Sequence, residues 1–331
     1  MNAREIKRQI GALRDKALYG IRDQRLKVAS EAARVGWIAE AVQELRPLPE
    51  PKNVTAEVHT LCGEDQANMG IWASWSVMRY LSDARFVVHS DGTLSQRTID
   101  LWQRLVPGTR VFSRDAGLAA LETRLANFPH VLNWTRDYHF GAKLGGIHAL
   151  AKAPQILDMD TDVLVLSDPR VLRECLETPD WSMAWNREKK SHYAYPEALF
   201  RKHLGDRIGS FPEGLNGGFM LTRRLSDEDW ALIDDVIAAL EKDPHMDPLR
   251  YWMHQTLFAV LASSYGDGAR ALPKEYEIHY GATRPDSAVR HYVGNPGVRP
   301  RFFTEGIPVV IRDARSQGQL PLDFFRNEVP D

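Results

Sequence analysis

The sequence is poor in the features that would send a chain out of the cell or into a membrane. Among 331 residues there are two cysteines, Cys62 and Cys175, too few for a disulfide framework. No apolar run approaches the roughly 18 residues of a transmembrane helix, and the charged N-terminus does not resemble a signal peptide. The formal net charge of −2 gives no bulk preference for nucleic acid. We therefore expect a cytoplasmic protein without a transmembrane segment and without a nucleic-acid partner.

The N-terminal segment has the pattern of a charged helix. Helical spacing runs through residues 3–46 with an interruption at Gly20, and "RPLPEPKN" (46–53) ends it as a linker. Residues 1–34 carry nine Lys or Arg against four Asp or Glu. Two interpretations stay open: a basic amphipathic segment that touches an anionic membrane surface or a partner chain, including a second copy, and a helical pair packed on the main domain. We take 1–52 as an N-terminal helical extension and linker, and 53–331 as the main domain.

From residue 54 on, apolar strands alternate with amphipathic helices. We expect strands over 56–62, 85–91 and 109–113, helices over 69–81, 95–105 and 140–152, and a further strand beginning at 155. This alternation predicts an α/β fold with a mostly parallel central sheet flanked by helices on both faces. Ligands of such sheets bind at the carboxyl ends of the strands.

Three aspartates alternate in "QILDMDTDVLVLSDP" (155–169), at Asp158, Asp160 and Asp162, inside an otherwise apolar strand. Ionised carboxylates are costly to bury unless they are paired or bound to a metal. A haloacid-dehalogenase-type phosphatase motif does not fit, because the fifth position of DxDx(T/V) would be Asp162 or Leu164. The aspartates could cap a turn and the next helix, or two of them could bind a hard divalent cation at the strand's end.

The metal interpretation has a family resemblance behind it. "LDMDTDVLVLSDP" resembles the DxD strand of GT-A glycosyltransferases, with the closest likeness to glycosyltransferase family eight, the group of glycogenin and the bacterial lipopolysaccharide galactosyltransferases. The resemblance implies a GT-A fold and places Asp160 and Asp162 on Mn²⁺ or Mg²⁺. Asp158 departs from the family, which usually has an apolar or aromatic residue there.

Three more segments resemble the family in the same order along the chain. In "GAKLGGIHAL" (141–150) the resemblance points to Lys143 as a basic residue that reaches the donor. In "LNGGFMLTRR" (215–224) it places Asn216 and Gly217 beside the donor sugar and the acceptor. In "WMHQTLFAVL" (252–261) Gln255 takes the family's Gln position. The acids that flank this Gln in the family are His254 and Thr256 here, which is a second departure.

The last resembling segment is "VRHYVGNPGVRP" (289–300). By resemblance His291 is the third metal ligand, Gly294 approaches the diphosphate, and Arg299 with Pro300 stands for a Lys-Pro pair, two residues late. His279 in "IHYGA" (278–282) competes for the ligand role, but its spacing to the next glycine fits the family less well.

The nucleotide is expected at the ends of the first two strands. In "TLCGED" (60–65) and "HSDGTL" (89–94) the candidates are Leu61, Cys62, Glu64 and Asp91, with Thr161 between the two metal-binding aspartates. The resemblance divides the main domain into a nucleotide-binding half of about 53–168 and an acceptor half of about 169–310.

The function implied is metal-dependent transfer of a sugar from a nucleotide-diphosphate donor, with a UDP-sugar favoured, to an unidentified saccharide, glycolipid or protein acceptor, with retention of anomeric configuration. Two alternatives stay open. A nucleotidyltransferase also uses paired carboxylates and a divalent metal, but "TLCGEDQANMG" lacks the Lys or Arg of its usual Gly-rich loop. A non-catalytic nucleotide-sugar-binding protein of the same fold would suit the lost acids beside Gln255.

Overall fold

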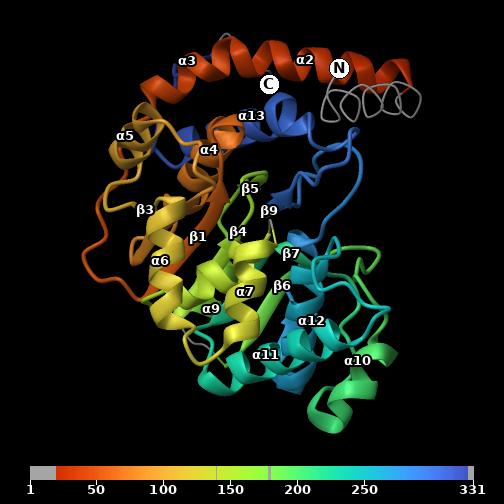
Figure 1. Ribbon diagram of the computed structural model, residues 1–331. Helices are drawn as coiled ribbons and strands as arrows, with labels where there is room; N and C mark the ends of the chain where they lie inside the picture. The colour runs from red at the N-terminus through yellow and green to blue at the C-terminus, as the bar shows by residue number, and fades with distance from the viewer. Residues whose placement is uncertain (1–19, 139, 178–179, 327–331) are drawn as a thin grey trace, which may run out of the picture.

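The computed structural model describes residues 20–138, 140–177 and 180–326. The main sheet has seven strands in the order β3-β2-β1-β4-β7-β6-β8 (Figure 1). Neighbouring strands run parallel except around β7, which is antiparallel to both β4 and β6. The expected α/β fold with a mostly parallel central sheet flanked by helices is therefore confirmed. The strands are β1 (Ala56–Cys62), β2 (Ala84–Ser90), β3 (Arg110–Phe112), β4 (Gln155–Met159), β6 (Met183–Arg187), β7 (Leu215–Arg223) and β8 (Ala269–Ala271).

One hydrophobic core lies on each face of this sheet, because alternate residues of a strand point to opposite faces. Along β7, Phe219 and Leu221 join the first core while Met220 joins the second. The first core is covered by α2 (Ile21–Val35), α3 (Trp37–Glu44), α4 (Ala67–Met78), α5 (Gln96–Leu105), α9 (Arg170–Glu177) and α13 (Ile307–Ser316). The second is covered by α6 (Arg114–Arg124), α7 (Pro129–Asp137), α8 (Ile147–Leu150), α10 (Glu197–Leu204), α11 (Asp227–Lys242) and α12 (Met253–Tyr265).

The strands expected at 56–62, 85–91 and 109–113 appear as β1, β2 and β3 with ends shifted by one residue at most. The segment beginning at 155 differs from expectation, since it forms two strands instead of one. β4 stays in the main sheet, and β5 (Val163–Val165) leaves it to pair with β9 (Val289–His291) in a two-stranded antiparallel sheet. The helix expected over 140–152 appears as the π-helical turn η2 (Ala142–Gly146) followed by α8.

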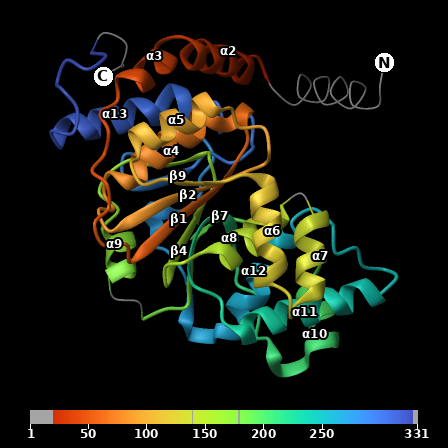
Figure 2. The ribbon, with the colours of Figure 1, turned by 60° about the vertical axis from the view of Figure 1, so that its left-hand side comes forward.

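The described part of the N-terminal segment packs on the main domain. α2 and α3 meet at Gly36, and both views show them at the same end of the molecule as α13 (Figures 1 and 2). From α3 and the residue after it, Ile38, Ala41, Val42 and Leu45 are buried in the first core. The first part of the expected helix, residues 3–19, lies outside the described residues. No helix of the described ranges is both long and apolar enough to cross a membrane.

Candidate metal centre

A turn at the carboxyl end of β4 positions the two aspartates of the DxD segment. The Asp160 amide donates to the Gly218 carbonyl on β7 (2.8 Å), and the Val163 amide donates to the Asp160 carbonyl (3.2 Å). These two bonds close the turn and direct the chain out of the main sheet into β5. Asp160 and Asp162 therefore lie at the sheet edge where ligands of α/β proteins bind.

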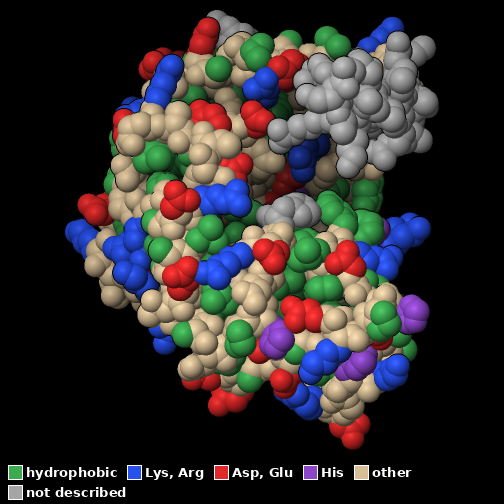
Figure 3. All heavy atoms as spheres, in the orientation of Figure 1, with side chains coloured by type: hydrophobic (Ala, Val, Ile, Leu, Met, Phe, Trp, Pro, Cys, Tyr) green, Lys and Arg blue, Asp and Glu red, His purple; other side chains and the backbone are tan. Residues whose placement is uncertain are grey.

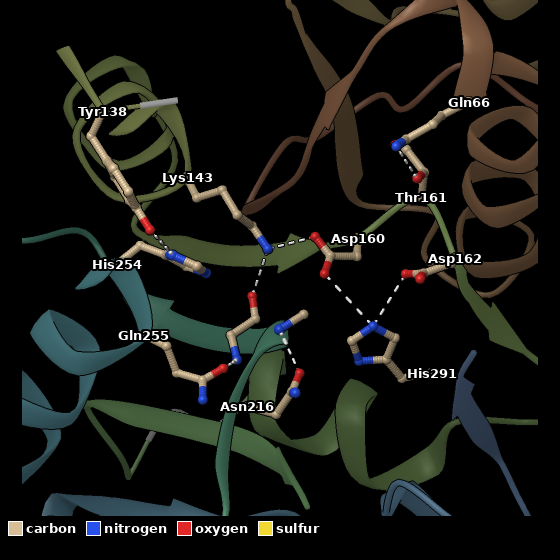
Figure 4. A network of polar contacts seen from close by, with 12 residues as sticks. Gln66, Tyr138, Lys143, Asp160, Thr161, Asp162, Asn216, His254, Gln255 and His291 are labelled. Atoms are coloured by element: carbon tan, nitrogen blue, oxygen red, sulfur yellow. Dashed lines mark hydrogen bonds and ion pairs between the residues drawn. The ribbon is translucent and has the colours of Figure 1, made fainter. Parts of the chain in front are cut away.

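His291 reaches the same turn from β9. Residue 291 pairs with Val163 across the β5–β9 ladder, and the Tyr292 amide donates to the Asp162 carbonyl (2.8 Å). Its Nε2 lies 3.1 Å from Asp162 Oδ1 and 3.6 Å from Asp160 Oδ2 (Figure 4). One ligand atom from each of Asp160, Asp162 and His291 falls within 4.8 Å of the others, so the triad could hold a metal ion. His279 lies outside this group, with its Nδ1 3.4 Å from the Glu277 carbonyl.

Two cations contact the outer carboxylate oxygens of the triad. Lys143 Nζ donates to Asp160 Oδ1 (2.5 Å) and to the Gly217 carbonyl (2.8 Å). The Arg299 guanidinium donates to Asp162 Oδ2. The other oxygens, Asp160 Oδ2 and Asp162 Oδ1, are those that face His291. An ion between these two oxygens and the imidazole would therefore leave both cations in contact with their carboxylates.

Neighbouring charges keep Asp162 and Lys143 ionised despite their burial. Burial raises the pKa of Asp162, but the neighbouring His291 and Arg299 outweigh it and lower this pKa to about 2. Burial likewise lowers the pKa of Lys143, but the Asp160 carboxylate raises it above its usual value. The triad is thus an anionic pair held between two cations. Figure 3 shows acidic and basic side chains at the bottom of a hollow near the level of β5 and β9.

The third aspartate of the segment, Asp158, has a different environment. It lies within β4 with no exposed surface, opposite His59 of β1 and Met220 of β7. Neither carboxylate oxygen has a hydrogen-bond partner among the described residues. Burial raises the pKa of Asp158 to about 7, although the Lys143 charge lowers it in part. Asp158 is therefore a buried carboxyl of the sheet and does not belong to the triad.

The start of β7 forms the wall of the site beside the triad. A Cβ on Gly218 would lie 2.1 Å from His291 Cε1 and 2.7 Å from Asp160 Oδ2, so only glycine fits there. The Gly217 amide donates to Gln255 Oε1 (3.0 Å), and the Gly218 amide donates to Asn216 Oδ1 (2.9 Å) (Figure 4). The structure thus brings Asn216, Gly217 and Gln255 together next to the triad.

Thr256 and His254, which stand where the family that this sequence resembles has acids, make structural contacts. Thr256 Oγ1 accepts from the Ala194 amide (2.8 Å) and donates to the Trp252 carbonyl (3.0 Å). His254 Nδ1 lies 3.2 Å from the Tyr138 hydroxyl (Figure 4). Neither side chain supplies a carboxylate to the site.

A carboxylate comes instead from Glu188, which follows β6 and which the sequence did not single out. Its Oε2 accepts from Asn216 Nδ2 (3.0 Å), and its Oε1 accepts from the Tyr280 hydroxyl (2.6 Å). In the sequence Glu188 is part of the charged run "REKK" (187–190). Such a run indicates a solvated loop, so nothing in the sequence marked it as buried.

The carboxylates expected at the nucleotide are engaged in loop contacts. Glu64 accepts from the Ser95 amide (2.8 Å) and from the Thr98 hydroxyl (2.8 Å) at the N-terminus of α5. Asp91 Oδ1 accepts from the Thr93 amide (2.9 Å) and hydroxyl (2.6 Å). These bonds shape the loops that follow β1 and β2 and leave less of both carboxylates for a ligand.

The remaining nucleotide candidates lie at the end of β1 and in the DxD turn itself. Leu61 and Cys62 are the last residues of β1, and the Cys62 thiol is buried. The backbone carbonyl of Cys62 accepts from the Asp91 amide (3.2 Å). Thr161 Oγ1 donates to Gln66 Oε1 (2.9 Å), which ties the turn to the N-terminus of α4 (Figure 4).

Arg299, the partner of Asp162, also lines a pocket of about 570 Å³. Its walls come from α2, from the start of α4 and from the loop after His291, with Lys27, Asn68, Gly294 and Arg299 among the lining residues. The N-terminal segment therefore borders the candidate site, which its place before the linker did not suggest.

Comparison with known proteins gives a likeness to solved structures alone. No protein-family model and no curated protein matches the sequence. Mouse xyloside xylosyltransferase 1 is 14% identical over 74% of this chain and 99% of its own, with a TM-score of 0.48. The galactosyltransferase LgtC, in complex with donor and acceptor sugar analogues, is 15% identical over 80% of this chain and 100% of its own, with a TM-score of 0.45. Core-mannan synthase A from Aspergillus fumigatus, in an Mn/GDP form, is 10% identical over 78% of this chain and 92% of its own, with a TM-score of 0.48. At these values none of the three assigns an activity to this chain.

Proposed function

We propose that this chain is a GT-A glycosyltransferase that moves a sugar from a nucleoside-diphosphate donor to an acceptor, and that the donor is a UDP-sugar. The observation that carries the proposal is the triad of Asp160, Asp162 and His291 between Lys143 and Arg299 at the carboxyl end of β4. Glycosyl transfer leaves a diphosphate, and a site with this charge pattern suits a metal-bound diphosphate.

The donor set fits a divalent cation such as Mn²⁺ or Mg²⁺. Two carboxylate oxygens are hard ligands, and the imidazole nitrogen favours Mn²⁺ over Mg²⁺. When bound, the ion would neutralise charge on the diphosphate as the sugar leaves. Asp160, Asp162 and His291 would hold it, while Lys143 and Arg299 would add positive charge beside the same phosphates. Gly294 adjoins the Arg299 guanidinium, since a Cβ there would lie 3.5 Å from Arg299 Nη2, and we assign it to the diphosphate.

The other residues divide between the two ends of the donor. We assign Leu61, Cys62, Thr161 and Asp91 to the nucleoside end, where Glu64 acts by fixing the loop. We assign Asn216, Gly217 and Gln255 to the transferred sugar and the acceptor. Gln255 is oriented for this role, because its Oε1 accepts from the Gly217 amide and its Nε2 donates to the His192 carbonyl (2.7 Å).

A nucleotide screen tests the proposal. Melting temperatures are measured with UDP, GDP and their sugar derivatives, each with and without Mn²⁺. A ligand that binds the native state raises the melting temperature by mass action, by an amount equivalent to about 2.7 kcal/mol at a hundred times its Kd. We expect a Mn²⁺-dependent rise with uridine nucleotides and slow release of free sugar from one UDP-sugar.

Three other outcomes separate the alternatives. Binding without sugar release under any condition would favour a non-catalytic nucleotide-sugar-binding protein. Release of pyrophosphate from a nucleoside triphosphate and a sugar phosphate would favour a nucleotidyltransferase. The absence of any Mn²⁺-dependent nucleotide binding would refute the proposed function.

A further inference from the structure

Glu188 is a buried carboxylate that the metal triad does not use. Its side chain is 6% exposed, and its two oxygens accept from Asn216 Nδ2 and from the Tyr280 hydroxyl. The His192 imidazole lies 3.7 Å away. Within residues 20–138, 140–177 and 180–326, no Lys or Arg forms an ion pair with Glu188. Burying a carboxylate without a cation is costly, and two neutral donors compensate for it only in part.

One side chain connects Glu188 to the triad. Asn216 donates to Glu188 through its Nδ2 and accepts from the Gly218 amide through its Oδ1 (2.9 Å). Gly218 in turn is the residue packed against His291 and Asp160. Glu188 therefore fixes which way the Asn216 amide faces, and it lies on the side of the site that we assign to the sugar.

The second oxygen of Glu188, Oε1, accepts a hydrogen bond from a hydroxyl group, as it would from a sugar. The Tyr280 hydroxyl donates to Oε1 at 2.6 Å, while the Tyr280 residue is half exposed to solvent. A pyranose hydroxyl donates to a carboxylate in the same way, and hydrogen bonds to a charged acceptor are among the stronger ones in proteins. Since Tyr280 reaches Glu188 from a partly exposed position, a ligand that brings its own hydroxyl can take its place.

We propose that Glu188 binds a hydroxyl of the transferred sugar and that the Tyr280 hydroxyl holds this position until the sugar arrives. Glu188 is then a specificity residue, and the acid absent beside Gln255 is supplied from the end of β6. This inference rests on the proposed function, because it needs a nucleotide sugar bound at the triad.

Calorimetry with Mn²⁺ separates sugar recognition from nucleotide recognition. The ligands are UDP, GDP, UDP-glucose, UDP-galactose, UDP-N-acetylglucosamine and GDP-mannose, and the proteins are the native chain, Glu188→Gln, Tyr280→Phe and the control Glu213→Gln. Glu213 suits a control because it lies in the same half and its side chain is 91% exposed. The quantity compared is the ratio of the affinity for a nucleotide sugar to the affinity for the bare nucleotide.

We expect Glu188→Gln to lower this ratio about 10- to 100-fold for the preferred sugar while the affinity for UDP stays unchanged. Tyr280→Phe should raise the ratio several-fold, since it removes the competing hydroxyl, and Glu213→Gln should change nothing. Should Glu188→Gln fail to fold, as judged by circular dichroism, Tyr280→Phe alone decides the matter.

The two levels of the proposal fail in different ways. If UDP and GDP do not bind the native chain with Mn²⁺, the proposed function is wrong, and the inference falls with it. If nucleotides bind but the ratio is the same in the native chain, Glu188→Gln and Tyr280→Phe, Glu188 is structural and only the inference is overturned. Equal loss of bare nucleotide and nucleotide sugar in Glu188→Gln leads to the same conclusion.

Discussion

Replacing Asp162 with Asn tests the proposed metal site with a small change, because one carboxylate oxygen becomes an amide nitrogen. The variant keeps the size of the side chain and removes the negative charge that faces His291 and Arg299. We expect the Mn²⁺ affinity to collapse, and with it the Mn²⁺-dependent part of UDP binding, while the fold persists.

The size of both effects follows from the surroundings of Asp162. Changes one shell away from a metal typically cost 10- to 100-fold in affinity, so loss of a direct ligand should cost at least 100-fold, or about 2.7 kcal/mol. The cost to stability should be smaller. The side chain of Arg299 is 41% exposed, so it can turn to water once its partner is gone, which limits the loss of stability.

The assay is titration of Mn²⁺ alone, then of UDP with and without Mn²⁺, together with a melting curve. Asp168→Asn is the matched control, because Asp168 lies six residues further on, is partly exposed and pairs with Arg173. Unchanged Mn²⁺ affinity in a folded Asp162→Asn variant would refute the metal assignment. An equal loss in the control would show that the effect is not specific to the triad.

Three further predictions can be checked on the same protein. His291→Ala should raise the Mn²⁺ requirement for donor hydrolysis at least 100-fold, and His279→Ala should leave it within error; the reverse order in a Mn²⁺ titration would move the site. A chain that begins at Asn53 loses the α3 side chains of the first core and should be destabilised by on the order of 5 kcal/mol, seen as a lower urea midpoint; an unchanged midpoint would contradict this. Burial lowers the pKa of His148 in the folded state to about 3, whereas in the unfolded state it is about 6.5. Below about pH 6.5 the imidazole is therefore protonated in the unfolded state but not in the folded state, and the free energy of unfolding falls. This should cost about 2 kcal/mol between pH 7 and pH 5, and His148→Gln should show a shallower fall in urea unfolding at the two pH values.

The elements that the sequence predicted well are those with a strong local signal. Buried strands contain short apolar runs such as Phe86 to Val88 in β2, and the N-cap of α5 is Ser95, whose hydroxyl accepts from the Thr98 amide (3.3 Å). The motifs were predictable because each combines a residue type with a spacing. Which strands pair with each other was harder to predict from the sequence, since β5 and β9 are more than a hundred residues apart.

The parts that escaped prediction depend on long-range contacts. The direction of β7 is not encoded by its own pattern, and only pairing with β4 and β6 makes it antiparallel. The sequence around Glu188 is typical of a solvated loop. Only the structure shows that its carboxylate is hydrogen-bonded to Asn216 and Tyr280. By contrast, burial of Ile38 and Val42 in the first core agrees with one of the two interpretations of the N-terminal segment, a helical pair packed on the main domain.

The three alternating aspartates lie in different environments because β4 ends between Asp158 and Asp160. In a continuous strand, Asp158, Asp160 and Asp162 would share one face, and all three would be buried together. The Asp160 amide still bonds to Gly218 on β7, and the turn closed by the Val163 amide on the Asp160 carbonyl then takes the chain out of the sheet, so that Asp160 and Asp162 lie beside His291. Asp158 stays in the sheet, where burial raises its pKa, while Arg299 and His291 lower the pKa of Asp162 against the effect of its burial. Two residues with the same side chain, four positions apart, thus differ in pKa because only one of them lies beyond the end of the strand.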